Sequence, residues 1–402
     1  MTKFTPIGAS AQRSMESLVA SVAQLRPLVD AHITPDRVLR YLIALADTPA
    51  PSTAASALRG PVLRDLLQAD GVRFGTQMSL DFNFGNTGSM VITTGSPEQF
   101  RRLWYFAHLD TISYLVQPLE RDRYPLVPFC YHLTRDGTRS ARAYRYELTS
   151  NDYSVCSEGE LISEAGLPYF RPLGANVALR PGDRIVPVAS SRLNSDGHFV
   201  GHIDNAGGVA ALAVAAPVLV QAGIGAMLGF PDEEEGPVGF GNQMIGRGGS
   251  RIIGSLAPPD LAIVVDVQQA GGASHATANN GPRNTTGLGR GAVLSEFSSL
   301  ARGAVTPPHL YELARFWSAR LGELGVKIQE SNNAYTSRSD DVSILLKTPN
   351  ILLLGFPGYD RHFDNAEPSA NLFDIVDLSK AVVYASALRQ ALFELLQTGY
   401  LP

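Results

Sequence analysis

Cysteine is scarce in this sequence, since Cys130 and Cys156 are the only two among 402 residues. Two thiols in so long a chain do not make the disulfide framework of a small secreted domain, so we expect no disulfide between them. The N-terminal segment also has no apolar run of the kind that a secretory signal needs. The sequence therefore predicts a cytoplasmic protein.

An excess of basic residues is missing as well. The chain has 33 Lys and Arg against 38 Asp and Glu, a formal net charge of −5 and a pI near 5.9. Such a chain has no general attraction for nucleic acid phosphates or for an anionic membrane, so we expect neither as a partner. A peptide or another small molecule remains as the expected partner.

Charge is absent from residues 209–230, over about the length that spans a bilayer. Pro217, Gln221, Gly223 and Gly225 interrupt this segment, which is richer in Ala than in Leu. The pattern favours a buried helix, a turn and a buried strand over a transmembrane helix.

Apolar runs of strand length alternate with helical patterns along the chain. This alternation predicts an α/β fold with a parallel or mixed sheet flanked by helices. Two helix starts carry N-cap residues, Thr34 and Ser379. The expected strands are 102–107, 226–230, 261–265 and 350–356, and the expected helices are 34–47, 309–324 and 379–397.

Residues 119–200 differ from the rest, because they are rich in Pro, Gly, Arg and Tyr and show hairpin-like polar alternation. We interpret them as a small β domain inserted into a catalytic α/β domain formed by residues 1–118 and 201–402. Oligomerisation and substrate access are the two roles that we consider for the insert.

Acidic and histidine residues follow the predicted strands at their carboxyl ends. His108 and Asp110 follow the first strand, and residues 232–235 follow the second. Asp266 ends the third strand, and His362 comes after the fourth. Ligands bind at the carboxyl ends of strands in open α/β sheets, so we expect these groups in one crevice.

Several carboxylates in one crevice need a cation. Each pair about 4 Å apart repels by roughly 4 kcal/mol at an effective dielectric constant near 20. The sequence shows no cluster of Lys or Arg beside these motifs, whereas His108 and His362 are neutral nitrogen donors. The pattern therefore predicts two divalent metal ions, zinc first, with cobalt or manganese as alternatives.

The sequence offers two His-x-Asp triplets. In the first, Asp110 can accept the second ring N–H of His108 and fix its tautomer. In the second, Asp204 follows His202 and begins DNAGGVAALAVAA at a helix start, where it could bridge two metals. We therefore expect His202 not to be a ligand, and we keep His275, which follows the strand of Asp266, as a candidate for substrate contact.

The acidic run DEEEGPVG begins at Asp232. In isolation it would fit a solvated loop, but its position directly after a buried strand favours the site. Two adjacent carboxylates can divide the work there, because one can bind a metal while its neighbour takes a proton from the activated water.

Several segments resemble, in order and spacing, the tetrahedral and glutamyl aminopeptidases, a family of dinuclear zinc exopeptidases. They include FAHLDTISYLV, HIDNAGGVAAL, FPDEEEGPVGFG and LLGFPGYDRHFDNAEPSA. The resemblance implies a zinc-exopeptidase-like fold, homo-oligomers, and removal of N-terminal residues from peptides. It also implies that His108, Asp204 and Asp266 bind one zinc and that Asp204, Glu234 and His362 bind the other.

The resemblance assigns the general base through the family pattern E-E-x-G-x-x-G. Glu233 then becomes the base and Glu234 the ligand, because Gly236 and Gly239 fall on the two glycines. A shift by one residue breaks this match.

Three departures from the family pattern bear on substrate choice. Thr111 stands where the family has an acidic residue, Ser113 replaces a glycine, and DNAGG lacks the usual arginine after its aspartate. An aminopeptidase is the first expectation. A dinuclear zinc deacylase, dipeptidase or carboxypeptidase acting on small amides is the second, and a non-catalytic scaffold that retains the fold is the third.

Overall fold

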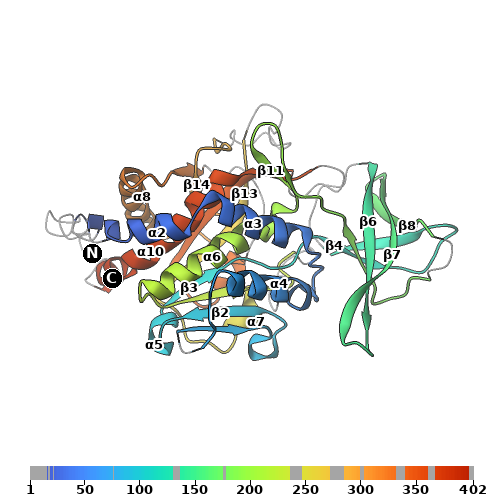
Figure 1. The fold of residues 1–402 in the computed structure, drawn as a ribbon, viewed down its shortest axis with the longest axis horizontal. Coiled ribbons are helices and arrows are strands. Elements are labelled where there is room, and N and C mark those ends of the chain that lie inside the picture. Colours follow the sequence, from blue (N-terminus) through green and yellow to red (C-terminus); the bar gives the residue numbers. More distant parts are fainter. Residues whose placement is uncertain are drawn as a thin grey trace, which may run out of the picture.

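The computed structural model describes residues 22–75, 77–129, 136–174, 178–235, 247–271, 285–298, 303–331, 340–360 and 367–397, with residues 16, 19 and 20. For residues 389–397 it describes the backbone alone. These residues form a large α/β domain with a small β-barrel projecting from one end (Figure 1).

A mixed sheet runs through the α/β domain, and the described part of the chain contributes eleven strands to it. Strands β12, β3, β13 and β16 are mutually parallel and occupy its centre. They contain the four apolar runs expected to form strands, so that expectation is confirmed. In spatial order the strands are β1 (Met78–Asp81), β2 (Met90–Thr94), β12 (Ala226–Phe230), β3 (Leu103–Phe106), β13 (Leu261–Gln269), β16 (Ile351–Tyr359), β17 (Ser369–Asn371), β11 (His198–Val200) and β10 (Arg192–Leu193), while β14 (Ala292–Ser295) joins β16 to β15 (Ile328–Ser331).

Helices cover both faces of this sheet (Figure 1). Side chains alternate along β3, so Leu103 and Tyr105 pack in one core while Trp104 and Phe106 pack in the other. The first core also takes side chains from α2, α3, α4, α6, α8 and α10, and the second takes them from α7 and α9. The helices are α2 (Arg26–His32), α3 (Pro35–Asp47), α4 (Ala55–Ala69), the 3-10 helix η1 (Phe84–Asn86), α5 (Pro97–Phe100), α6 (Ile203–Gln221), α7 (Gly249–Ile253), α8 (Pro308–Glu323), α9 (Asp341–Ile344) and α10 (Leu372–Gln397).

Helix α6 is apolar on every side because it lies in the core. Among the described helices it alone has the length and hydropathy of a membrane span, and 94% of that span is buried inside the protein. Strand β12 follows it after a turn, which confirms the expected buried helix, turn and strand. Near its start, a Cβ on Gly207 would lie 2.3 Å from the Phe356 ring, so only glycine allows α6 to pack this closely on β16.

The two predicted N-caps have different outcomes. Thr34 caps α3, and its hydroxyl accepts a hydrogen bond from the Arg37 N–H at 3.3 Å. The prediction for Ser379 is wrong, because α10 begins at Leu372 and the Ser379 hydroxyl donates to the Ile375 carbonyl within the helix. A serine inside a helix can bond the carbonyl four residues back, and the sequence alone does not distinguish that use from a cap.

The inserted β domain is a closed barrel with its own apolar core around Tyr114, Phe170 and Ile185. Its strands extend from Ser113 to Pro187, whereas β10 and β11, within the expected range 119–200, belong to the large sheet. Figure 1 shows the barrel at the end of the molecule opposite the two termini. Around the barrel the order is β4 (Ser113–Val116), β5 (Tyr124–Phe129), β8 (Leu167–Pro172), β7 (Asp152–Glu164), β6 (Gly137–Glu147) and β9 (Arg184–Pro187).

Candidate metal centre

The predicted site residues that the structure describes converge at the carboxyl edge of the parallel strands. His108 lies just beyond β3, and the acidic run lies just beyond β12. Asp266 lies inside β13, three residues before its end, and Asp204 lies in the first turn of α6. The expected meeting of these segments at one edge is therefore what the fold produces.

His108 is at the centre of this cluster. Its Nε2 lies 3.0 Å from Asp204 Oδ1, 3.6 Å from Glu234 Oε2 and 3.7 Å from Asp266 Oδ1. Two groups of buried ligand atoms share this histidine. Within each group, all the ligand atoms lie within 4.8 Å of one another. One contains Asp204 and Glu235, and the other contains Glu234 and Asp266. Imidazole and carboxylate donors in two overlapping groups suit divalent cations such as zinc.

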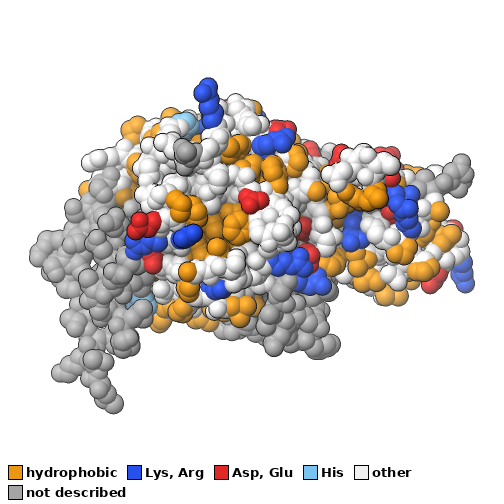
Figure 2. Space-filling view, turned by 90° about the horizontal axis from the view of Figure 1, so that it is seen from below, with side chains coloured by type: hydrophobic (Ala, Val, Ile, Leu, Met, Phe, Trp, Pro, Cys, Tyr) orange, Lys and Arg blue, Asp and Glu red, His pale blue; other side chains and the backbone are white. Residues whose placement is uncertain are grey.

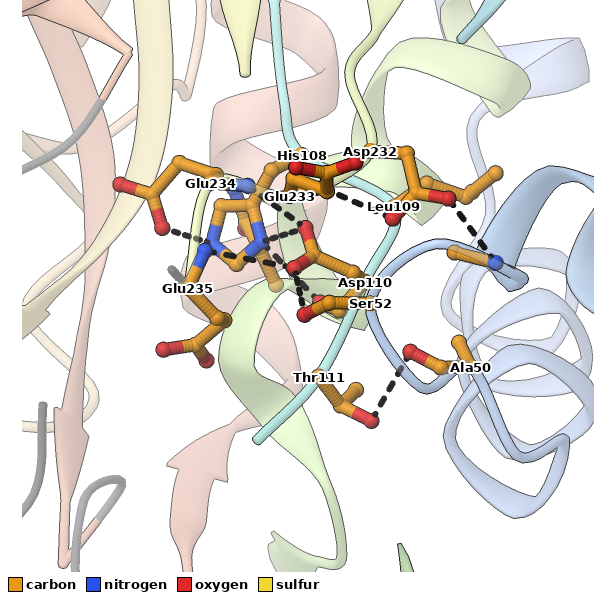
Figure 3. Close-up of polar contacts among 12 residues, drawn as sticks. Ala50, Ser52, His108, Leu109, Asp110, Thr111, Asp232, Glu233, Glu234 and Glu235 are labelled. Atoms are coloured by element: carbon orange, nitrogen blue, oxygen red, sulfur yellow. Dashed lines mark hydrogen bonds and ion pairs between the residues drawn. The ribbon is translucent and has the colours of Figure 1, made fainter. Parts of the chain in front are cut away.

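Asp110 anchors the backbone of the acidic run. Its carboxylate accepts hydrogen bonds from the N–H of Glu234 at 3.1 Å and of Glu235 at 3.3 Å, and from the Ser52 hydroxyl at 2.6 Å (Figure 3). The Nδ1 of His108 lies 3.1 Å from the Asp110 carbonyl oxygen but 3.6 Å from its carboxylate. The backbone carbonyl can therefore accept the second His108 N–H, while the carboxylate holds the loop.

Glu233 has a different environment from its two neighbours. Arg251 donates to both of its carboxylate oxygens, at 2.7 and 3.0 Å, and Arg247 donates to one of them at 3.1 Å. The expectation that no arginines lie beside the acidic run is wrong here, because the fold brings back residues 14 and 18 positions further along the chain. Glu233 also has a φ of 69°, which turns the chain between Asp232 and Glu234.

Glu234 is the glutamate of this run whose carboxylate lies next to His108 (Figure 3). The same carboxylate is also close to Asp266. Its Oε1 is buried and has no hydrogen-bond partner among the described residues. The glycines that set the sequence register, Gly236 and Gly239, lie outside the described residues. Glu233 as the base and Glu234 as the ligand therefore stay predictions.

Burial makes the charge of this cluster costly. It is the main cause that raises the pKa of Glu234 well above its usual range, and Asp266 adds to the shift while His108 opposes it. Burial opposes a charge on His108, but Glu234 and hydrogen bonds to Asp110, Asp204 and Asp266 outweigh it and raise the His108 pKa. Excess buried negative charge of this kind is what a bound cation offsets.

The three remaining histidines of the sequence analysis are His362, His275 and His202. His362 and His275 lie outside the described residues. His202 is buried, and burial first, followed by the charges of Arg139 and Arg59, lowers its pKa to about 3, which keeps the ring neutral.

Thr111 and Ser113, two of the three departures from the family pattern, both hold the loop that carries Ser52. The Thr111 N–H donates to the Ala50 carbonyl at 2.8 Å, and the Ser113 hydroxyl accepts from the Ser52 N–H at 3.3 Å. Both side chains are buried, and Ser52, which Ser113 contacts, donates to the Asp110 carboxylate.

Two further buried acids had no role assigned from the sequence, although one of them, Asp232, was identified as the start of the acidic run. Asp340 has one carboxylate oxygen bonded to the Gly249 N–H at 2.6 Å and one without a partner among the described residues. Burial raises its pKa to about 7. Asp232 accepts the N–H groups of Thr53 and Ala55 and thereby fixes the start of α4. Asp340 has no spacing signal in the sequence that would have identified it.

Comparison with solved structures gives the same architecture for known proteins. Aminopeptidase APDkam598 from the archaeon Desulfurococcus kamchatkensis matches 91% of this chain and 98% of its own, with a TM-score of 0.67 and 16% identity. The TET1 peptidase of Pyrococcus horikoshii, which can assemble into a tetrahedron or a large octahedral shell, matches 87% and 99%, with a TM-score of 0.64 and 17% identity.

The chain has the fold of the tetrahedral aminopeptidases. An endoglucanase from Thermotoga maritima shares the fold too, with a TM-score of 0.55, 15% identity, and coverage of 89% of this chain and 99% of its own. No family model and no curated protein matches the sequence. At these identities the likeness fixes the α/β fold with its inserted barrel, and activity has to be argued from the site.

Proposed function

We propose that this protein is a metal-dependent aminopeptidase that removes N-terminal residues from peptides. The observation that carries the proposal is the convergence of His108, Asp204, Glu234 and Asp266 on one buried edge of the sheet. The fold shared with an aminopeptidase and a peptidase supports it. A scaffold protein would have no use for so much buried negative charge.

The donor set fits two divalent ions, for which zinc is proposed and cobalt or manganese are alternatives. In our proposal His108, Asp204 and Asp266 hold one ion, and Asp204, Glu234 and His362 hold the other. Bound there, the ions would supply Lewis-acid polarisation of the scissile carbonyl and a lowered pKa for the attacking water. Asp110 positions the ligands by fixing the His108 ring and the loop of Glu234.

A carboxylate of the acidic run takes the proton of the attacking water and passes it to the leaving amine. The family register proposes Glu233 for this role. The contacts support Glu234 as a second candidate, because Glu233 is already paired with Arg247 and Arg251 while Glu234 lies beside His108. Glu235 would then take the place of Glu234 as ligand, as its grouping with His108 and Asp204 suggests.

Three single changes, Glu233→Gln, Glu234→Gln and Glu235→Gln, test the proposal on an aminoacyl substrate panel with metal analysis. Loss of the base should leave two metals bound and lower kcat by roughly 100-fold or more. Loss of a ligand should lower the metal content. Glu158→Gln on the barrel surface serves as control. Full activity in all three variants, or a chain without metal, would contradict the proposal.

A deacylase, dipeptidase or carboxypeptidase with the same metal centre is the second candidate function. Hydrolysis of N-blocked substrates in the same panel would reveal it.

We also propose a homo-oligomer acting in the cytoplasm. The barrel exposes apolar side chains including Val127, Leu148, Leu167 and Leu173, and apolar surface is plain at the barrel end in Figure 2. Light scattering tests the assembly.

A further inference from the structure

The Arg59 side chain is a buried cation next to the candidate metal centre. It comes from α4 and is 0% exposed, and no other Lys or Arg among the described residues is buried. Its Nη1 donates to the Leu109 carbonyl at 2.6 Å, and its Nη2 donates to the Thr48 carbonyl at 3.3 Å. Because Leu109 stands between His108 and Asp110, the guanidinium holds the segment that joins these two site residues.

These hydrogen bonds do not account for the charge of Arg59. Both partners are neutral carbonyls, and the Nε of Arg59 is buried without a hydrogen-bond partner among the described residues. A buried charge loses its hydration, so an apolar side chain of similar size would suit this place better if packing were the only need. A cation here therefore has to be explained by the charges around it.

The carboxylates of Asp110 and Asp204 are those charges. Burial is the main influence on the Arg59 guanidinium and lowers its pKa to about 10, while Asp110 and then Asp204 oppose the shift. The guanidinium is therefore still charged at neutral pH. It faces the residue that holds the acidic run and the residue proposed to bridge the two metal ions.

The two other arginines of the site have a different position. Arg247 and Arg251 both pair with Glu233, and their side chains are 31% and 35% exposed. Water screens the charge of a partly exposed group more than that of a buried one. Of these three arginines, Arg59 is therefore the one whose charge acts on the cluster from inside the protein.

We propose that Arg59 is a positioning residue that offsets the negative charge of the acidic cluster in the metal-free protein and so keeps Asp110 and Asp204 in place for metal binding. The proposal rests on the proposed function, because it assumes the metal centre. Bound metal ions supply the same compensation, and Arg59 then repels them. Arg59 therefore stabilises the metal-free protein and weakens metal binding, whereas a purely structural arginine would stabilise both states alike.

A double-mutant cycle in the metal-free protein tests the compensation. Arg59→Gln keeps a hydrogen-bond donor but removes the charge, so it should raise the equilibrium constant of unfolding. This rise should be roughly 10-fold smaller in a protein that already carries Asp204→Asn. Arg59→Lys keeps the charge and should retain most of the coupling. Arg64→Gln on the same helix, where the side chain is 40% exposed, is the matched control and should show none.

Calorimetric zinc titration tests the opposite effect on metal binding. Arg59→Gln should bind zinc about 10-fold more tightly than the wild type, and zinc should raise its melting temperature by more. Arg59→Lys and Arg64→Gln should bind zinc like the wild type. An Arg59→Gln protein that folds only with zinc would support the proposal as well. One that folds in neither state would overturn it, because metal would then not replace the charge.

The proposal and the proposed function fail on different results. Equal destabilisation with and without Asp204→Asn, or weaker zinc binding in Arg59→Gln, would make Arg59 a structural cross-link and overturn its role in charge compensation. Hydrolysis by the wild type could persist in that case. A wild-type protein that binds no zinc, with the coupling between Arg59 and Asp204 intact, would instead reject the proposed function and leave the compensation standing.

Discussion

The Ser52 hydroxyl donates a hydrogen bond of 2.6 Å to the Asp110 carboxylate, although the two residues are 58 positions apart. Both are buried, and Asp110 in turn holds the backbone of Glu234 and Glu235. The loop before α4 thus reaches the candidate metal centre through one side chain.

Ser52→Ala should lower the free energy of unfolding by about 1 to 3 kcal/mol, because a buried carboxylate loses a donor. We also expect weaker metal binding, since Asp110 would hold the acidic run less firmly. Denaturant unfolding and calorimetric zinc titration measure the two effects. Ser150→Ala on an exposed turn is the control, and an equal change in both variants would argue against the link.

Arg251→Gln should destabilise the protein more than Arg247→Gln. Arg251 bonds both oxygens of the buried Glu233 carboxylate, whereas Arg247 bonds one, so the first change leaves more of a buried charge uncompensated. We expect a difference on the order of 1 kcal/mol in denaturant unfolding. Equal losses would show that the two arginines are interchangeable.

Removal of metal by a chelator should lower the melting temperature, and added zinc should restore it. An ion that binds only the folded state stabilises it by about 2.7 kcal/mol when its free concentration is 100 times the Kd. Asp204→Asn, which removes the proposed bridging charge, should respond much less. A melting temperature that is the same with chelator and with zinc would count against a metal centre.

Asp374→Asn should flatten the pH dependence of stability between about pH 4 and 7. Burial raises the Asp374 pKa to about 7 even though the N–H groups of Gly289 and Gly291 favour its charged form. A carboxyl whose pKa is raised by folding stabilises the protein fully below its unfolded pKa, and this contribution is lost as pH rises through 7. Unfolding at several pH values, with Asp65→Asn as surface control, checks the slope.

Gly207→Ala should cost about 1 to 3 kcal/mol, because the new methyl group would overlap the Phe356 ring and push α6 away from β16. Gly322→Ala is the control, because a Cβ on Gly322 in α8 would meet open space. Gly223 is less suitable, because its φ of 68° would strain an alanine there. Thermal unfolding of both variants gives the comparison. Equal melting temperatures would contradict the close packing.

The layout of the candidate site was accessible from the sequence because long apolar runs mark buried parallel strands. His108 and the acidic run come directly after such runs, so their meeting at one edge follows from the fold class. The same holds for Asp266, although β13 continues three residues beyond it. The start of α10 was harder to predict from the sequence. No N-cap residue type marks Leu372, whereas Ser379 is of a type that often caps helices.

The hydrogen bonds and ion pairs that hold the site residues in place could not be predicted from the sequence in this way. Ser52 and Asp340 are single polar residues whose partners are 58 and 91 positions away, and no periodicity connects them. The pairing of Glu233 with Arg251 depends on how the chain turns after the acidic run. Which of three adjacent glutamates faces His108 is decided by one backbone turn, at the positive φ of Glu233.

One of the two connections between the barrel and the α/β domain adjoins the candidate metal centre. Strand β4 begins at Ser113, shortly after Asp110, whereas the returning chain enters the large sheet as β10 and β11 before it reaches Asp204. A tilt of the barrel would therefore act directly on the segment of Asp110, while strand pairing in the large sheet holds the segment of Asp204 in place.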